Sequence, residues 1–89
     1  MDLGDFLKFR DEVCSNFLKN SKVASIVLYG ASFATLNFLS NTMKEYFEDK
    51  GEKIEIVIDD KTEKNFIKEK YSEKYLINVY SLLQNSQRD

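Results

Sequence analysis

The chain of 89 residues contains no histidine, and this absence excludes several kinds of site. Catalytic triads built on serine or cysteine use histidine as their general base, and many zinc sites use it as a ligand. Neither arrangement can form within this chain. A single cysteine, Cys14, also rules out an intrachain disulfide, which suits a reducing cytoplasm. Cys14 falls on the apolar face of the first predicted helix, where we interpret it as core filler rather than as a reactive thiol.

Long hydrophobic runs and clustered basic residues are also missing. No apolar run approaches the roughly 20 residues of a membrane span, and the N-terminus is acidic where a signal peptide is basic. The net charge is -2, so we expect no patch that binds nucleic acid through its phosphates. We therefore predict a cytoplasmic protein that contacts neither membrane nor nucleic acid.

The composition that remains is that of a folded α/β domain. The chain is 43% hydrophobic and 31% charged, which argues against disorder. We predict one domain over residues 1–89, with an N-terminal amphipathic helix in 1–20, a Rossmann-like βαβαβ core in 23–83 and a frayed tail in 85–89. A chain of this length buries only about 60–65% of its unfolded surface, so the core is expected to be modest.

The first half of the chain reads as helix, strand and helix. Spacings of three and four predict a helix from Leu3 to about Lys19, capped by Asp2. The nearly continuous apolar run from Val23 to Tyr29 predicts a central strand buried on both faces. The next helix runs from Phe33 to about Asp49. The predicted inward residues of the first helix are Leu3, Phe6, Leu7, Cys14, Phe17 and Leu18.

Glycine and serine mark the ends of the second helix. Gly30 permits a tight turn after the first strand, Ser32 is a suitable N-cap, and Gly51 sits where a left-handed residue closes a helix. The second strand, Lys53 to Ile58, mixes alternating and continuous apolar positions, which favours an edge strand.

The second half predicts a short helix, a third strand and a final turn. Asp60 and Glu63 have capping-box spacing and open a helix through about Tyr71, with Phe66 and Ile67 inward. Residues 76–80 predict a brief strand ending at Tyr80. Ser81 and Gln84 repeat the capping spacing ahead of a closing turn or short helix.

This order of elements predicts a parallel sheet in the order 2-1-3. Right-handed crossovers place the second and third strands on opposite sides of the first. Open α/β sheets bind ligands beside such a switch point, and backbone N–H groups at a helix N-terminus attract anions. The candidate ligand residues here are Gly30, Ala31 and Ser32. Only one glycine of the dinucleotide fingerprint is kept, so we disfavour NAD or FAD and leave open a phosphate site or a plain capped turn.

Acidic residues end the second strand. Asp59 can accept hydrogen bonds from a ribose or sugar hydroxyl; alternatively, Asp60 caps the next helix and Asp59 is solvated. Paired carboxylates also suggest Mg²⁺ or acid–base chemistry, but a further acidic partner is missing nearby. We predict no metal and no cofactor. Tyr29 and Tyr80, at two strand ends, either frame a pocket or simply pack.

Three segments resemble the small Rossmann-like N-terminal domains of sugar acyltransferases and related polysaccharide-biosynthesis proteins. They are residues 26–32 (Ile-Val-Leu-Tyr-Gly-Ala-Ser), Asp59-Asp60, and residues 77–82 (Ile-Asn-Val-Tyr-Ser-Leu). The resemblance implies a nucleotide-sugar held by Gly30, Ala31, Ser32 and Asp59. The chain departs from the family at Phe33 and Thr35, where Gly-x-Gly usually continues, and the family's catalytic β-helix does not follow within these 89 residues.

Two functions from different classes remain open. The first is a non-catalytic interaction protein, for example a small bacterial or phage regulator, that forms a homodimer or binds a protein partner through open sheet edges or the spare apolar helix residues Phe9, Val13 and Phe38. The alternative is a binding module for a nucleotide-sugar or phosphate ligand at the turn after the first strand. An enzyme is less favoured because no catalytic motif is present.

Overall fold

The computed structural model describes residues 2–86, with the side chains of residues 85 and 86 left undescribed. Over this range the chain forms four helices and a three-stranded parallel sheet in the order β2-β1-β3, with the N-terminal helix first. The predicted α/β class and strand order are therefore confirmed. The helices are α1 (Leu3–Asn20), α2 (Phe33–Asp49), α3 (Lys64–Lys70) and α4 (Val79–Ser86), and the strands are β1 (Ser25–Tyr29), β2 (Glu55–Asp59) and β3 (Tyr75–Asn78).

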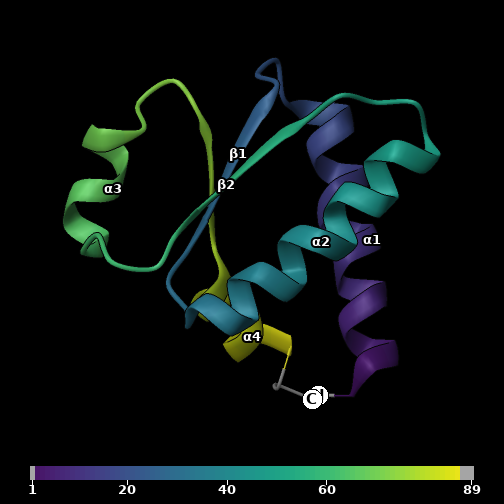
Figure 1. Ribbon diagram of the computed structural model, residues 1–89, viewed down its shortest axis with the longest axis horizontal. Helices are drawn as coiled ribbons and strands as arrows, with labels where there is room; N and C mark the ends of the chain where they lie inside the picture. Colours follow the sequence, from purple (N-terminus) through teal and green to yellow (C-terminus); the bar gives the residue numbers. More distant parts are fainter. Residues whose placement is uncertain (1, 87–89) are drawn as a thin grey trace.

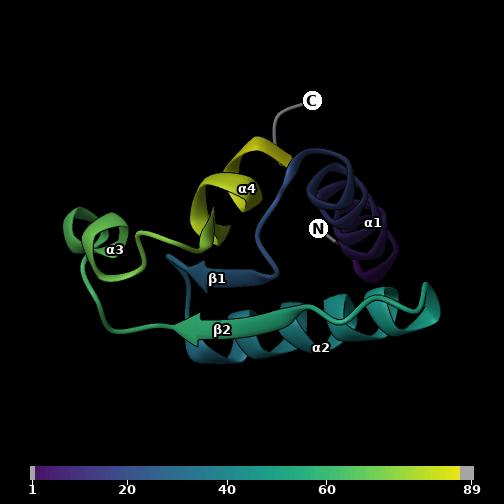
Figure 2. The ribbon, with the colours of Figure 1, turned by 90° about the horizontal axis from the view of Figure 1, so that it is seen from above.

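The helices are divided between the two faces of the sheet. In Figure 1, α1 and α2 lie together on one side of the strands and α3 lies on the other, while α4 starts where β3 ends. Figure 2, seen from above, shows α2 running beside β2 and α4 on the far side of β1. The carboxyl ends of the strands lead into α2, the loop before α3, and α4. This end of the sheet is where the predicted ligand residues lie.

The main core lies between the sheet and the pair α1 and α2. Because side chains alternate along a strand, Ile26 and Leu28 of β1 face this core while Val27 faces α3. Val27 is nevertheless fully buried, so β1 is covered on both faces as predicted. The buried residues of the main cluster are Cys14, Phe17, Ile26, Leu28, Leu36, Leu39, Met43, Phe47, Ile77 and Val79.

The caps of α1 and α2 form as the sequence predicts. Oδ1 of Asp2 accepts a 2.8 Å hydrogen bond from the backbone N–H of Asp5, and Ser32 caps α2 through Thr35. At the other end of α2, Gly51 has φ +70° and the N–H of Glu52 donates to the carbonyl of Phe47. This pair of features is a Schellman motif, in which a left-handed residue lets the chain leave the helix.

The predicted start of α3 is wrong. The N-cap of α3 is Glu63, it makes no side-chain capping bond, and Asp60 caps nothing. The side chain of Phe66 is 54% exposed although we predicted it to face inward, whereas Ile67 is fully buried as predicted. A helix of seven residues presents too narrow a face to bury two consecutive large side chains against one sheet.

The predicted ends of the last elements also need correction. β3 ends at Asn78, and Val79 and Tyr80 already belong to α4, so Ser81 is an internal helical residue and not a cap. Oδ1 of Asn78 accepts from the N–H of Ser81 and so caps α4. Residues 85 and 86, predicted to be frayed, are helical in their backbone, and the rest of that tail lies outside the described residues.

Three smaller predictions about strand starts and exposure are corrected as well. Val23 lies outside β1 and is 37% exposed, and β2 begins at Glu55 instead of residue 53. Leu3, predicted to face the core, is 60% exposed at the first turn of α1. Along the described residues, no helix has both the length and the apolar character needed to cross a membrane.

Candidate functional site

The turn after β1, where the sequence predicts the ligand residues, contains a left-handed glycine and leads into an exposed helix N-terminus. Gly30 has φ +85°, a conformation that L-residues with a side chain rarely adopt. Oγ of Ser32 accepts a 3.4 Å hydrogen bond from the N–H of Thr35 and lies 3.1 Å from Oγ1 of the same residue. Ser32 and the first residues of α2 are exposed, and the side chain of Phe33 is 57% exposed. The N-terminus of α2 is therefore open to solvent, while Ala31 packs against the core.

The space directly beside Gly30 is occupied by the start of α4. A Cβ placed on Gly30 would lie 2.5 Å from Oδ1 of Asn78 and 3.6 Å from Cβ of Tyr80. The parallel register explains this contact, because Tyr29 is paired with Asn78 across β1 and β3. The glycine is thus required by a neighbouring strand end as well as by its own turn.

Asp59 is buried and its carboxylate is fully engaged. Oδ1 accepts hydrogen bonds from the backbone N–H groups of Lys61 and Thr62, at 3.2 and 2.8 Å. Oδ2 accepts from Oγ1 of Thr62 at 2.9 Å, Nζ of Lys70 at 2.9 Å and Oη of Tyr71 at 2.6 Å. A carboxylate has about four lone-pair directions, so these five bonds use its accepting capacity. The expectation of a solvated Asp59 is wrong, because the residue is only 7% exposed.

The hydrogen bonds keep Asp59 ionised. Burial raises the pKa of its carboxyl, but bonds from Tyr71, Thr62 and Lys70 outweigh the burial and hold that pKa well below the usual range. The bond to Asp59 in turn raises the pKa of Lys70 and of Tyr71. The cluster therefore pins the loop between β2 and α3 to the end of α3. It does not direct a free carboxylate toward the Gly30 turn.

Tyr80 and Lys64 form an exposed pair that the sequence did not reveal. Tyr80 lies in the first turn of α4, so its predicted place at a strand end, beside that of Tyr29, is wrong. Nζ of Lys64 lies 4.6 Å from the centre of the Tyr80 ring, and Nε2 of Gln84 donates a 2.8 Å bond to its hydroxyl. The phenol ring is thus held at the surface by a cation–π contact and an i, i+4 hydrogen bond.

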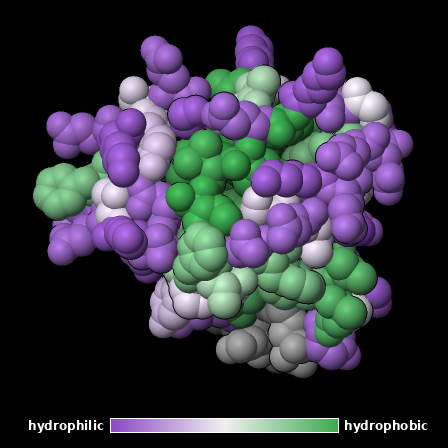
Figure 3. All heavy atoms as spheres, in the orientation of Figure 1, coloured by the Kyte–Doolittle hydropathy of each residue, from purple (hydrophilic) through white to green (hydrophobic). Residues whose placement is uncertain are grey.

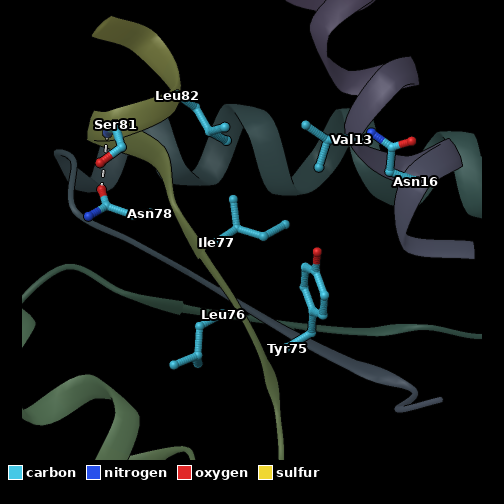
Figure 4. A pocket seen from close by; sticks show the side chains of 8 residues that line it. All are labelled: Val13, Asn16, Tyr75, Leu76, Ile77, Asn78, Ser81 and Leu82. Carbon is cyan, nitrogen blue, oxygen red and sulfur yellow. Dashed lines mark hydrogen bonds between the residues drawn. The ribbon is translucent and has the colours of Figure 1, made fainter. Parts of the chain in front are cut away.

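A pocket lies where β3 meets α1 and α4. Its volume is about 350 Å³. Figure 4 shows the side chains of Tyr75 and Ile77 on the pocket side of β3 and that of Leu76 pointing to the other side. None of the lining residues is charged, although 31% of the chain is. The lining residues are Val13, Asn16, Tyr75, Leu76, Ile77, Asn78, Ser81 and Leu82. The sequence analysis did not predict this pocket. The available signal was Val13, an apolar residue that lies beside the main apolar face of α1.

The outer edges of the sheet present backbone hydrogen-bonding groups. The N–H of Glu55 donates a 2.9 Å bond to the carbonyl of Ala24, which establishes which residues of β2 bond to β1. Bonding direction alternates along a parallel strand, so the N–H and C=O groups of Ile56 and Ile58 point outward. By the same alternation and register, Val27 of β1 bonds to β3 and the backbone groups of Leu76 point outward. Within residues 2–86 no further strand covers either edge.

The edge at β2 is also apolar. In Figure 3, hydrophobic side chains gather at the centre of the face, in the place that β2 occupies in Figure 1, with hydrophilic ones around them. Ile56, Val57 and Ile58 of β2 are each partly exposed. An apolar strand edge with outward hydrogen-bonding groups is a surface on which another strand can add.

The candidate site therefore has two parts, the turn at Gly30 and the open sheet edges. The acid that we expected to serve the turn is held by the α3 loop instead. The resemblance to sugar acyltransferase domains stays a prediction, carried by its three short segments alone. No protein-family model, curated protein or solved structure matches the chain.

Proposed function

We propose that this chain is a non-catalytic interaction protein that binds another polypeptide, or a second copy of itself, by adding a strand to an open edge of its sheet. The observation that supports the proposal is that outward backbone hydrogen-bonding groups and apolar surface occur together at both β2 and β3. Main-chain hydrogen bonds supply affinity in this mode of recognition, and pockets for alternate side chains supply specificity.

The number of available backbone groups supports the proposal. Ile56 and Ile58 each direct one N–H and one C=O outward on β2, and Leu76 does so on β3. Native proteins commonly protect such edges with lysine, proline or a bulge. The strands themselves, Glu55–Asp59 and Tyr75–Asn78, contain neither lysine nor proline. An edge without these features is suited to a partner strand. The reducing cytoplasm is the setting we propose, in keeping with an unpaired Cys14.

A phosphate-ligand or nucleotide-sugar module of polysaccharide biosynthesis is the second candidate. The positive φ of Gly30 and the exposed N-terminus of α2 favour it. Two observations count against it: Asn78 and Tyr80 lie against Gly30, and the hydrogen-bonding capacity of Asp59 is used within the protein. We therefore rank it below strand addition.

Two measurements test the proposed function. Sedimentation over protein concentrations up to about 1 mM detects self-association in the weak range. A displayed library of random peptides, selected on the immobilised chain, detects binding of extended partners. Strand addition predicts dimer formation, enrichment of peptides, or both, and each is weakened by the double variant Val57→Lys with Leu76→Lys, because edge lysines oppose pairing.

The matched control is Lys44→Ala, on the exposed face of α2 and away from both edges. A chain that stays monomeric at the highest concentration and enriches no peptide contradicts the proposal. Titration with inorganic phosphate and with a uridine diphosphate sugar, read by amide shifts at residues 30–35, tests the second candidate. Shifts confined to that turn support the ligand module in place of strand addition.

A further inference from the structure

The pocket beside β3 is placed to receive a side chain from a strand that pairs with β3. Leu76 directs its N–H and C=O away from β1, at the open edge of the sheet. The pocket lies beside the same strand, between Val13 and Asn16 of α1 and Ser81 and Leu82 of α4. Tyr75 lines it and is 39% exposed, so the pocket is reached from solvent. One extended segment can therefore make main-chain bonds to Leu76 and place a side chain against Ile77.

The volume of the pocket and the absence of charge among its lining residues indicate which kind of side chain it binds. About 350 Å³ is at the small end of the range for ligand sites, roughly 300–1,000 Å³. That space suits one or two apolar side chains better than a nucleotide-sugar. All eight lining residues are uncharged, so a charged side chain would lose its hydration there without gaining a partner. The asparagine and serine side chains at the rim offer hydrogen bonds to a main chain.

The neighbouring helices favour a partner segment over a second copy at this edge. The side chains of α1 and α4 border the pocket on both sides of Ile77 (Figure 4). A second copy that approached through its own β3 would bring its own α1 and α4 against the same helices. A single extended segment carries no such helices. The β2 edge, by contrast, has an apolar surface over the strand itself (Figure 3) and suits self-association.

We propose that the β3 edge binds an extended, uncharged segment of a partner protein as a fourth strand, with one large apolar side chain in the pocket between α1 and α4. This inference rests on the proposed function and specifies the edge and the chemistry of the partner. It assigns the pocket residues a role in specificity and Leu76 a role in main-chain pairing.

The test uses the displayed peptide library as its probe and three variants of the full chain. Leu76→Pro removes the outward N–H of β3 while leaving the bonds of Tyr75 and Ile77 to β1, and Leu76→Ala controls for the lost side chain. Val13→Phe fills the pocket from α1. Circular dichroism and thermal unfolding show that each variant is folded.

Peptides enriched on the wild type are expected to be poor in charge and to alternate apolar with polar residues. They should bind Leu76→Pro and Val13→Phe about tenfold more weakly than the wild type, and Leu76→Ala less than about threefold more weakly. Should Leu76→Pro not fold, amide protection of Leu76 in the wild-type complex replaces it as the measurement.

The outcomes separate this inference from the function on which it rests. Enriched peptides that bind Leu76→Pro and Val13→Phe as well as the wild type, and lose affinity for Val57→Lys, overturn the β3 site but leave strand addition standing. Enriched peptides rich in charge likewise overturn it. A monomer that enriches no peptide overturns both proposals.

Discussion

The hydroxyl of Tyr71 donates a 2.6 Å hydrogen bond to Oδ2 of Asp59, and so joins the residue after α3 to the last residue of β2. The same oxygen accepts from Lys70 and Thr62. With this many donors, the buried carboxylate stays ionised at little cost in the free energy of folding. Removing one of its hydrogen-bond partners, or the carboxylate itself, is expected to lower that stability considerably. The position of α3 on the sheet therefore depends on one acidic side chain together with the buried Ile67.

Replacing Asp59 is expected to destabilise the protein more than replacing its hydrogen-bond partner Tyr71. Asp59→Asn places an amide NH₂ among donors, and we expect a loss of about 2–3 kcal/mol in the free energy of unfolding. Tyr71→Phe leaves the other donors in place and should cost about 1 kcal/mol. Urea unfolding measures both, with the exposed neighbour Asp60→Asn as the control, expected within about 0.5 kcal/mol of wild type. Equal losses for the two replacements at residues 59 and 60 would contradict the assigned network.

The free energy of unfolding should fall in acid because of the Asp59 carboxyl. The pKa of Asp59 is lower in the folded than in the unfolded protein, so its contribution is complete above the unfolded value of about 4 and is lost as pH falls through the folded value. Glu55 acts in the same direction, since hydrogen bonds from Lys74 and Ser25 lower its pKa, but it is exposed and contributes less. Urea midpoints between about pH 2 and pH 6 measure the slope. Asp59→Asn should flatten most of it; an unchanged slope would assign the acid sensitivity elsewhere.

Two glycines with positive φ should respond differently to alanine. Gly51→Ala meets no atom within 4 Å, so only backbone strain of about 1 kcal/mol is expected. Gly30→Ala adds a clash with Oδ1 of Asn78, which caps α4, and we expect about 2–3 kcal/mol in total.

A double-mutant cycle isolates the contact between Gly30 and Asn78. Adding Asn78→Ala removes the clash, so the double variant should be about 1 kcal/mol more stable than the sum of the single losses predicts. Simple additivity would show that the side chain of Asn78 does not constrain this turn. Thermal unfolding of the four proteins provides the energies.

The packing of α3 on the sheet should depend on one residue of that helix. Ile67 is fully buried, so Ile67→Ala is expected to cost about 2–4 kcal/mol. Its neighbour Phe66 is 54% exposed, and Phe66→Ala should change stability by less than about 0.5 kcal/mol. Urea unfolding compares the two. A larger loss at residue 66 than at residue 67 would mean that α3 packs through the opposite face.

Cys14 should be unreactive in the folded protein. The thiol is buried against Phe17 and its neighbours in the main core, and burial raises its pKa to about 12. Since the thiolate is the reactive form, labelling by a disulfide reagent at neutral pH should be at least about a hundredfold slower than in urea, where the chain is open. Absorbance of the released thiol measures both rates. Comparable rates would place Cys14 at the surface.

The element order and the sheet topology follow from local patterns that the sequence displays. The apolar run ending at Tyr29 and the caps Asp2 and Ser32 are properties of short segments, since hydrogen bonds and periodicity act over a few residues. The handedness of parallel crossovers then leaves one arrangement, the order 2-1-3. For this reason the elements through residue 59 were predicted to within about two residues.

Only the tertiary structure decided what surrounds the candidate site residues. Capping spacing at Asp60 and Glu63 was a valid local signal, yet neither residue makes a side-chain cap. The neighbouring Asp59 is instead bonded to residues 11 and 12 positions further along the chain, which no local spacing reveals. Asn78 ended β3 and capped α4 at once, two residues before the predicted strand end. Sequence alone thus determined the strands, their order and the turn at Gly30. Only the tertiary structure decided the hydrogen bonds of Asp59, the contact of Gly30 with Asn78 and the pocket beside β3. These features arise where segments distant in sequence pack together, and no local pattern encodes that packing.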